Sequence, residues 1–572
     1  MSSKRNTILS QAIRTAMTAG LLLGAASSSA FAAIDTSSIP AGTVNSGPVL
    51  FNAGDLVVTS SYYEGTASNL VAGSTLAGST AGVTSTAVAA GSSYLNVWNN
   101  TTPDGSFGIT SPIIVSDVNA STGAVNTNYN LTNIAATQGI NLVTSFSSKS
   151  ELSVNLSTGG NAFTLNGYAT TVGQIDVSNS NTPGVIDTSN PTVGISAPTY
   201  RSIAQLNTDG SLQVTNTNAY SGNNGRSTIL DTATNTYYIT GNAGNSGKPV
   251  PAGELPILSA NTGVQSIQAG SNNGTIAGTT NANATTTVVG ALTADGQHGF
   301  SVTQTGAPSD KVGKDDNFRG ETVFNNTLYV TKGSGGNGVD TVYQVGATGS
   351  LDSLAANGAT TPISILPGFP TGLASATPTN YPFGLWFANA NTLFVADEGA
   401  GGKLNASGNI AIADGSLNAT AAGNGQAGLE EWVLGTNGVW TEAHVWQAGL
   451  NLGVSYSVSG TALGVSGTYS AATDGLRTLI GQVNADGSYT LYSTTSTISN
   501  SGDQGADPNK LVAITIAANS TGTESFTTLQ TAAYGEVLRG VAVAPVPLPP
   551  SLLMMLSGLG ITGLFARRNK RA

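Results

Sequence analysis

Cysteine is absent from this 572-residue chain, histidine occurs only 2 times, and charged residues make up only 9% of the sequence. Without cysteine there is no disulfide, no thiolate metal site and no cysteine nucleophile. Two histidines leave little material for a metal site or for acid–base catalysis. A phosphate-binding Gly-x4-Gly-Lys-Ser/Thr loop is also missing, and no Gly-x-Ser-x-Gly context pairs with a suitable base. These absences count against an enzyme.

Glycine is abundant, with 73 residues, and serine, threonine, asparagine and alanine fill most other positions. Disordered chains usually combine low hydrophobicity with high net charge, whereas hydrophobic residues here reach 39%. A neutral sequence of this kind, with scattered valine, leucine and tyrosine, is typical of many short strands joined by turns. We therefore predict an all-β fold with little helix outside the two ends of the chain. The length exceeds that of one compact core, so a repeat architecture or several domains are expected.

The formal net charge of −11 understates the acidity of the central part of the chain. Residues 34–545 contain 12 basic and 30 acidic residues, a balance of −18, because both ends are basic and contain no acid. We call residues 34–545 the body; its negative charge would repel nucleic acid and anionic lipid. It suits a protein that stays soluble outside the cell.

Residues 1–32 have the three parts of a secretory signal peptide. The basic start contains three cations: Lys4, Arg5 and Arg14. A short apolar region at residues 16–26 follows, and Ala30 and Ala32 then occupy the −3 and −1 positions. This pattern predicts cleavage by signal peptidase before Ala33. The alternative, an uncleaved N-terminal anchor, is disfavoured by the short apolar region.

Residues 546–572 combine a proline-rich motif, an uncharged apolar run and a group of cations. The motif consists of Val546, Pro547, Leu548 and Pro549. Its prolines should keep it extended, as a protease groove requires. The apolar run at residues 551–566 would span about 24 Å as a helix, which makes a short transmembrane helix. Four cations beyond it would hold that end on the cytoplasmic side: Arg567, Arg568, Lys570 and Arg571.

This layout resembles the C-terminal sorting signal of exosortase substrates, the PEP-CTERM family, in a Val-Pro-Leu-Pro variant. The resemblance implies export from a Gram-negative bacterium and transient anchoring in the inner membrane. It further implies cleavage at the motif by an exosortase-type protease and transfer to the envelope or the extracellular polymer matrix. An ordinary C-terminal anchor with a proline-rich stop is the alternative, but it does not explain so short a helix followed by so many cations.

Residues 33–545 contain a weak internal repeat, in which a turn residue precedes a short apolar strand ending in a small residue. Its six copies are residues 55–59, 161–165, 235–240, 326–331, 391–396 and 475–480. In three copies another apolar strand precedes the turn, at residues 227–230, 321–324 and 385–388. Each copy therefore predicts a hairpin with asparagine or Asp-Gly at the turn. Six Asp-Gly pairs are predicted to be hairpin turns, at residues 104, 209, 295, 414, 474 and 486.

A second hairpin follows the fifth copy, at residues 431–434 and 439–446, so the repeating unit has four strands. About six such units predict a β-propeller. Residues 538–543 match the first strand of a unit, whereas the first copy lacks one, so this last strand should close the ring. The body also resembles propeller-like proteins that carry this kind of tail, in Gly-Asp-Leu-Val-Val at 54–58 and Leu-Arg-Gly-Val-Ala-Val-Ala-Pro at 538–545. A β-helix or adhesin-like solenoid is the alternative.

Two stretches of the body carry residue types suited to ligands. On the strand at 439–446, strict alternation puts four residues on one face: Trp440, Glu442, His444 and Trp446. They suit a stacked sugar or a metal, although the outer face of a blade is the plainer interpretation. The acidic loop at 310–317 contains Asp310, Asp315 and Asp316, which suit Ca²⁺, although two lysines within it argue against a cation.

The sequence therefore predicts an exported protein without catalytic residues or a required cofactor. It would act as a structural or binding platform associated with exopolysaccharide or biofilm. The competing hypothesis is a secreted propeller hydrolase, lactonase or phosphoesterase-like, that uses a cation in the channel. Such an enzyme needs several carboxylates or histidines from different blades to converge on the axis.

Overall fold

The computed structural model separates Met1–Thr36 from Ser37–Ala572, and the fold described below belongs to the second unit. The structure describes residues 39–63, 109–146, 148–174, 177–190, 197–244, 253–254, 258–270, 276–277, 286–289, 316–333, 338–374, 380–401, 403–404, 410–411, 417–418, 426–462, 465–499 and 505–546. The predicted signal peptide, with Ala30, Ala32 and Ala33, lies outside these ranges. So does the tail from Pro547 onward. Within these ranges, no helix is long and apolar enough to cross a membrane.

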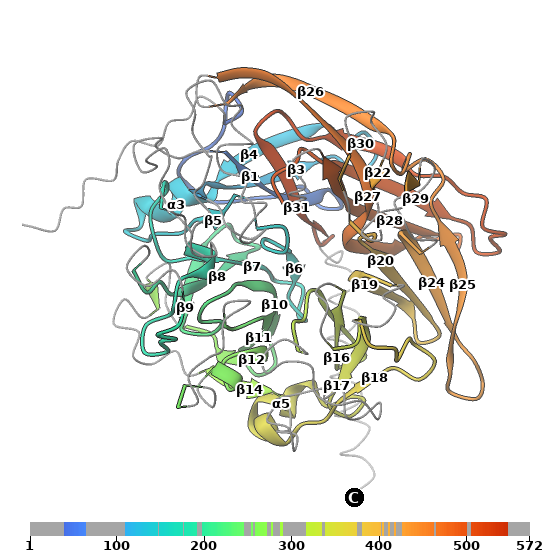
Figure 1. The fold of residues 1–572 in the computed structure, drawn as a ribbon, viewed down its shortest axis with the longest axis horizontal. Helices are drawn as coiled ribbons and strands as arrows, with labels where there is room; N and C mark the ends of the chain where they lie inside the picture. Colours follow the sequence, from blue (N-terminus) through green and yellow to red (C-terminus); the bar gives the residue numbers. More distant parts are fainter. Residues whose placement is uncertain are drawn as a thin grey trace, which may run out of the picture. The chain divides into compact units, whose positions relative to one another are not determined.

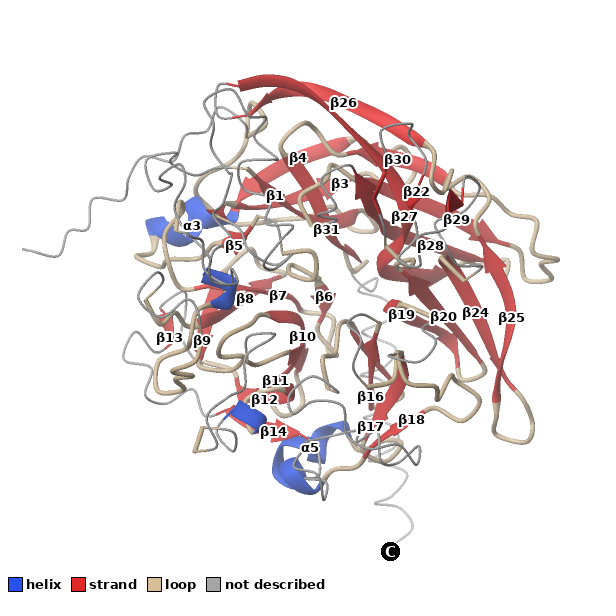
Figure 2. Cartoon of the chain, viewed as in Figure 1, coloured by secondary structure: helices blue, strands red, loops and turns tan. Residues whose placement is uncertain are grey.

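Strands dominate the described residues, and they form six sheets of at least four strands, which we call blades 1 to 6 in chain order (Figures 1 and 2). Blade 1 consists of β31 (Glu536–Val543), β1 (Leu56–Tyr62), β3 (Ile113–Val118) and β4 (Val125–Asn130). Blade 2 consists of β6 (Asn155–Leu156), β7 (Ala162–Tyr168), β8 (Arg201–Asn207) and β9 (Leu212–Thr217), with β13 (Ile276–Ala277) beside β9. Blade 3 consists of β10 (Gly225–Asp231), β11 (Thr236–Gly241), β12 (Gly263–Gln268) and β14 (Thr286–Val289).

Blades 4 to 6 repeat the same order. Blade 4 consists of β15 (Glu321–Phe324), β16 (Thr327–Lys332), β17 (Thr341–Val345) and β18 (Ile363–Ile365). Blade 5 consists of β19 (Pro382–Asn389), β20 (Thr392–Asp397), β24 (Gly428–Leu434) and β25 (Trp440–Trp446). Blade 6 consists of β27 (Val465–Val483), β28 (Tyr489–Ser499), β29 (Lys510–Ile516) and β30 (Thr527–Thr531).

Several short elements accompany the blades. The hairpin partner of β27 is β26 (Ser455–Ala462), and three short strands extend from β28, namely β21 (Lys403–Leu404), β22 (Ile410–Ala411) and β23 (Leu417–Asn418). A separate pair is formed by β2 (Thr110–Ser111) and β5 (Thr144–Ser145). The helical segments in the described residues are α3 (Leu131–Thr137), η2 (Val177–Asn179), α5 (Leu351–Asn357) and η4 (Gly358–Thr360).

The inner strands of the six blades contact one another in a closed ring. The order of contacts is β31, β6, β10, β15, β19, β27 and again β31. This arrangement is a six-bladed β-propeller and rules out the β-helix alternative. The ring is closed as predicted, because β31 pairs antiparallel with β1, with Val541 opposite Val58.

Within the described residues, six apolar clusters of the core lie one between each pair of neighbouring blades. Each blade supplies two clusters because adjacent strand residues face opposite sides of the sheet. On β11, for example, Tyr237 packs toward blade 2 and Tyr238 toward blade 4. The last cluster joins Leu56 of blade 1 to Tyr492 of blade 6, so hydrophobic burial also closes the ring.

The first five predicted repeat copies coincide with second strands of their blades, but the sixth does not. Residues 475–480 lie inside β27, the innermost strand of blade 6, and the second strand is β28. The cause is Asp474-Gly475, which was expected to turn but continues the strand, with Gly475 packed against the carbonyl of Asp397. The Asp-Gly pairs at 209 and 486 do lie between paired strands, as predicted. The remaining pairs, at 104, 295 and 414, lie outside the described residues.

Candidate functional site

The residues singled out on β25 do not share a face. Ala443 has no partner in the register, because His444 lies opposite Glu431 whereas Glu442 lies opposite the next residue, Trp432. This β-bulge reverses the alternation. Trp440 therefore packs into the cluster shared with blade 4, and Trp446 into the cluster shared with blade 6. The predicted sandwich of Glu442 and His444 between two tryptophans is wrong.

On this outermost strand, His444 and Trp446 both lie against carboxylate side chains. His444 Nδ1 lies 2.9 Å from Glu431 Oε2, and its ring lies 5.2 Å from that of Trp446. The buried Trp446 donates its indole N–H to Glu524 at 3.1 Å. In the acidic loop, Asp316 is buried and accepts from the Thr262 hydroxyl, while Asp310 and Asp315 lie outside the described residues. Over the described ranges, no three His, Asp or Glu side chains are placed to hold a metal ion.

A set of buried cations that the sequence did not reveal lies at the centre of the ring. All five arginines between residues 34 and 545 are buried, although the body is strongly acidic: Arg201, Arg226, Arg319, Arg477 and Arg539. Four of them belong to inner strands or the residues just before them, in blades 3, 4, 6 and 1. We call these four, together with Lys149, Glu151 and Glu398, the central cluster.

Segment 146–151, in which Ser147 is outside the described residues, connects the central cluster. Its backbone and side chains bond to four blades other than its own. Arg539 of blade 1 donates to the carbonyl of Phe146, and Asn224, just before blade 3, donates to Ser148 Oγ at 2.6 Å. Arg319 of blade 4 donates to Ser150 Oγ. A short segment that reaches so many blades must lie across the centre of the ring.

Blades 5 and 6 join the same cluster through Glu398, the residue after β20. Its carboxylate accepts from Lys149 Nζ at 3.3 Å and from Arg477 Nε at 3.2 Å. Burial alone would raise the pKa of Glu398, but Lys149, Arg477 and Arg319 together hold it below its usual value. Glu398 therefore stays ionised and pairs with two cations at once. Glu151, the other carboxylate of the central cluster, accepts from Tyr168 and from the Thr144 hydroxyl.

Two further carboxyl groups beside Glu398 behave differently. Burial raises the pKa of Asp397 to about 7 and that of Asp474 to about 8. Their hydrogen bonds come from backbone amides: Gly399 donates to Asp397, and Gly401 donates to Asp474, both at 2.8 Å. They come from different blades, and burial, together with repulsion from Glu398, lets them retain protons near neutral pH.

One feature of the sequence was connected with the central cluster. Arginine precedes glycine in Arg319-Gly320 and Arg539-Gly540, the two segments matched as first strands. A Cβ at Gly320 would collide with the carbonyl of Phe383 in the next blade, so the glycine allows neighbouring backbones to meet. Each arginine then reaches the centre. Segment 146–151 carried no comparable signal.

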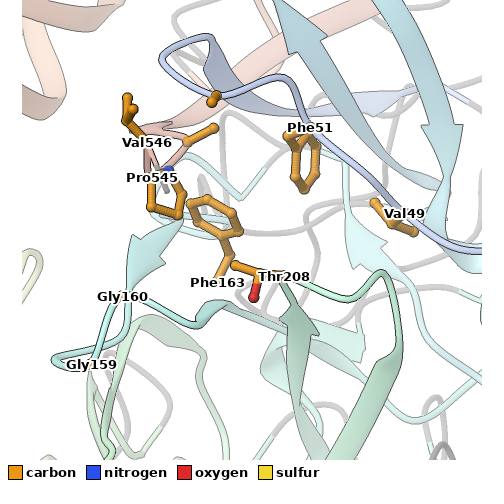
Figure 3. A pocket seen from close by; sticks show the side chains of 10 residues that line it. Val49, Phe51, Gly159, Gly160, Phe163, Thr208, Pro545 and Val546 are labelled. Atoms are coloured by element: carbon orange, nitrogen blue, oxygen red, sulfur yellow. The ribbon is translucent and has the colours of Figure 1, made fainter. Parts of the chain in front are cut away.

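An apolar pocket of about 490 Å³ lies between blades 1 and 2, where the described chain ends (Figure 3). The rings of Phe51 and Phe163 pack edge to face at 5.5 Å in its wall. Pro545 and Val546 form its rim, and Val546 is 69% exposed. The first residue of the predicted sorting motif is therefore accessible.

No protein-family model matches the chain, and no curated protein matches its sequence. Among solved structures, it is similar to a protein from Lactobacillus plantarum at 11% identity and a TM-score of 0.29, over 76% of this chain and 81% of that one. It is also similar to the acylaminoacyl peptidase of Pyrococcus horikoshii at 8% identity and a TM-score of 0.26, over 75% of this chain and 44% of the peptidase. At these TM-scores neither similarity supports a fold assignment, and the propeller is assigned from the order and contacts of the sheets.

Proposed function

We propose that this protein is exported, held briefly at the inner membrane and released by an exosortase-type protease. The released body is a non-enzymatic structural or binding platform in the cell envelope or the extracellular polymer matrix, where exopolysaccharide is the expected partner. Signal peptidase would remove residues 1–32, and cleavage at the Val-Pro-Leu-Pro motif would remove the basic tail.

The observation that carries the sorting proposal is that the motif begins directly after the last residues of the fold. The last backbone hydrogen bonds of blade 1 join Ala544 to Gly54 and Asp55, at 3.0 and 2.8 Å. The motif begins two residues later, at the exposed Val546. A cut within the motif therefore leaves every strand of the ring in place. A folded body this close to the cleavage point is what a releasable anchor requires.

The central cluster supports a structural platform rather than a channel enzyme. Segment 146–151 occupies the centre, and its groups are already bonded to five blades, its own included. Asp397 and Asp474 are the observation that favours the hydrolase alternative, because acids with a pKa near neutrality suit proton transfer. Against this, one oxygen of each accepts from a backbone amide of the 399–401 turn.

The sorting proposal is tested by the mass of the protein secreted from the native host. Wild type should lack both the signal peptide and the residues after the motif. A Pro547→Ala, Pro549→Ala double variant should keep an intact C-terminus and stay with the membrane fraction. A Pro367→Ala, Pro508→Ala variant, changed at two prolines of the body, serves as a control and should be processed normally. Identical C-termini in wild type and the motif variant would refute sorting.

A further inference from the structure

Two arginines of the central cluster lack a carboxylate partner. Arg226 and Arg319 form no ion pair within the described residues. Arg226 donates to Asn224 Oδ1 at 3.2 Å and to the carbonyl of Phe318 at 2.6 Å. Neutral acceptors do not balance a buried positive charge, and burying a charge without a counter-charge is costly.

Arg319 also has an unused donor. As a whole residue Arg319 is 93% buried, and its Nε has no hydrogen-bond partner, whereas Nη1 donates to Ser150 Oγ. Buried polar groups in folded proteins are almost always bonded, so an unfilled guanidinium donor indicates a missing acceptor. A guanidinium is shaped for two parallel bonds to an oxyanion.

The cationic residues Lys149, Arg226 and Arg319 belong to different segments that bond to one another. Arg226 bonds to Phe318, the residue before Arg319, and Arg319 bonds to Ser150, the residue after Lys149. Burial, followed by repulsion from Arg319, lowers the pKa of Arg226 well below its usual value. Like charges held this close are stabilised by an anion between them.

Solvent reaches the cluster at Lys149. Its side chain is 28% exposed, whereas the whole-residue exposures of Arg226 and Arg319 are 3% and 7%. A small ligand would therefore enter beside Lys149. A long polyanion would be repelled, because the surrounding body carries a formal charge of −18.

We propose that the centre of the propeller binds a small oxyanion, a phosphate or a sugar carboxylate, between Lys149, Arg226 and Arg319. Arg319 supplies Nε and the rest of its guanidinium, and Lys149 supplies the ammonium at the entrance. The anion neutralises charges that segment 146–151 leaves unbalanced. The site is independent of export and sorting.

The test is isothermal titration of the purified full-length chain with sodium phosphate and, separately, with sodium galacturonate, at constant ionic strength in chloride. At least one of the two anions should bind with a dissociation constant of about 1 mM or lower. Arg319→Gln should weaken binding by roughly tenfold or more, because it removes a charge-assisted bidentate partner. Lys149→Met should weaken it several-fold and, being partly exposed, serves as the main test if Arg319→Gln does not fold. Lys510→Met, which removes a half-buried cation of blade 6, is the matched control and should change nothing.

The outcomes separate the sources of the anion. Binding of phosphate alone assigns a phosphate ligand, binding of galacturonate alone assigns a sugar carboxylate, and binding of both assigns a general oxyanion site. Absence of binding by either would overturn the proposal. So would equal weakening in Lys149→Met and Lys510→Met, because that result means general attraction to positive charge.

Discussion

At the scale of single residues, Asp474 shows how burial changes the meaning of a familiar dipeptide. Asp-Gly is a turn signal in exposed chain, as at Asp486-Gly487, where the carboxylate accepts from the Ser488 amide and hydroxyl. Asp474 instead lies within β27, is 2% exposed and contacts the 399–401 turn. Burial keeps its carboxyl group protonated near neutral pH.

Asp474 should make stability fall as pH rises. Its pKa is about 8 in the folded state and about 3.9 when unfolded, so between pH 4 and 8 the folded state holds the proton more strongly. Its contribution is complete below the unfolded pKa and is lost as pH rises through the folded pKa. Asp474→Asn should remove up to about 1 kcal/mol per pH unit from the slope of unfolding free energy. Urea unfolding at pH 5, 6, 7 and 8 measures this slope.

Asp486→Asn provides the control for that experiment. Hydrogen bonds from Ser488 lower the pKa of Asp486, so this group is fully ionised over the same pH range in both states. Its replacement should leave the slope unchanged. If Asp474→Asn keeps the wild-type slope, the proton assigned to Asp474 is not there.

Gly540 is required by a close approach rather than by its backbone angle. A Cβ at this position would collide with the carbonyl of Leu152 and lie 2.6 Å from the Val154 nitrogen. Gly540→Ala should therefore lower the unfolding free energy by about 1–3 kcal/mol. Gly372→Ala, where a Cβ would meet no atom within 4 Å, should change it by less than about 0.5 kcal/mol. Equal midpoints for both variants in urea would contradict the close packing of blades 1 and 2.

At the scale of strands, the sequence was informative where contacts are local or repeated. Second strands were found because asparagine turns precede apolar runs, and β31 was found because residues 538–543 resemble 319–324. The bulge at Ala443 was missed because the predicted alternation assumes an unbroken strand, whereas a bulge depends on pairing with the neighbouring strand. Blade 6 was misassigned by one strand because its turn signal at Asp474 is buried.

Removal of β31 should destroy the closed ring, although its residues come last in the chain. A chain ending at Gly535 would expose the edge of β1 and the apolar neighbours of Leu538, Val541 and Ala542. We expect it to aggregate, whereas a chain ending at Val546 should unfold at the urea midpoint of the full-length protein. Gel filtration and urea unfolding of both chains provide the measurement. A soluble, cooperatively unfolding chain without β31 would show that closure contributes little.

At the scale of the whole molecule, the arginines of an acidic body are all buried. The body contains five arginines and seven lysines between residues 34 and 545, against 30 acidic residues. This burial was invisible in the sequence because it depends on distant contacts. Lys149 and Glu398 are 249 residues apart, and Phe146 and Arg539 are 393 apart. Such pairs have no local pattern, and only the closed ring brings them together.

Glu398 should therefore stabilise the ring as a whole. Glu398→Gln leaves Lys149 and Arg477 without their carboxylate, and breaking a buried pair typically costs about 3–5 kcal/mol of unfolding free energy. Because its folded pKa is depressed, this contribution is present above the unfolded pKa of about 4.3 and is lost as pH falls through the folded pKa. The difference from wild type should thus be large at pH 7 and smaller at pH 3. The matched control is Glu431→Gln, whose partner His444 is one-third exposed on an outer strand, and it should cost less than about 1 kcal/mol. Urea unfolding of both variants at the two pH values decides the matter, since equal losses would mean that the central cluster does not hold the blades together.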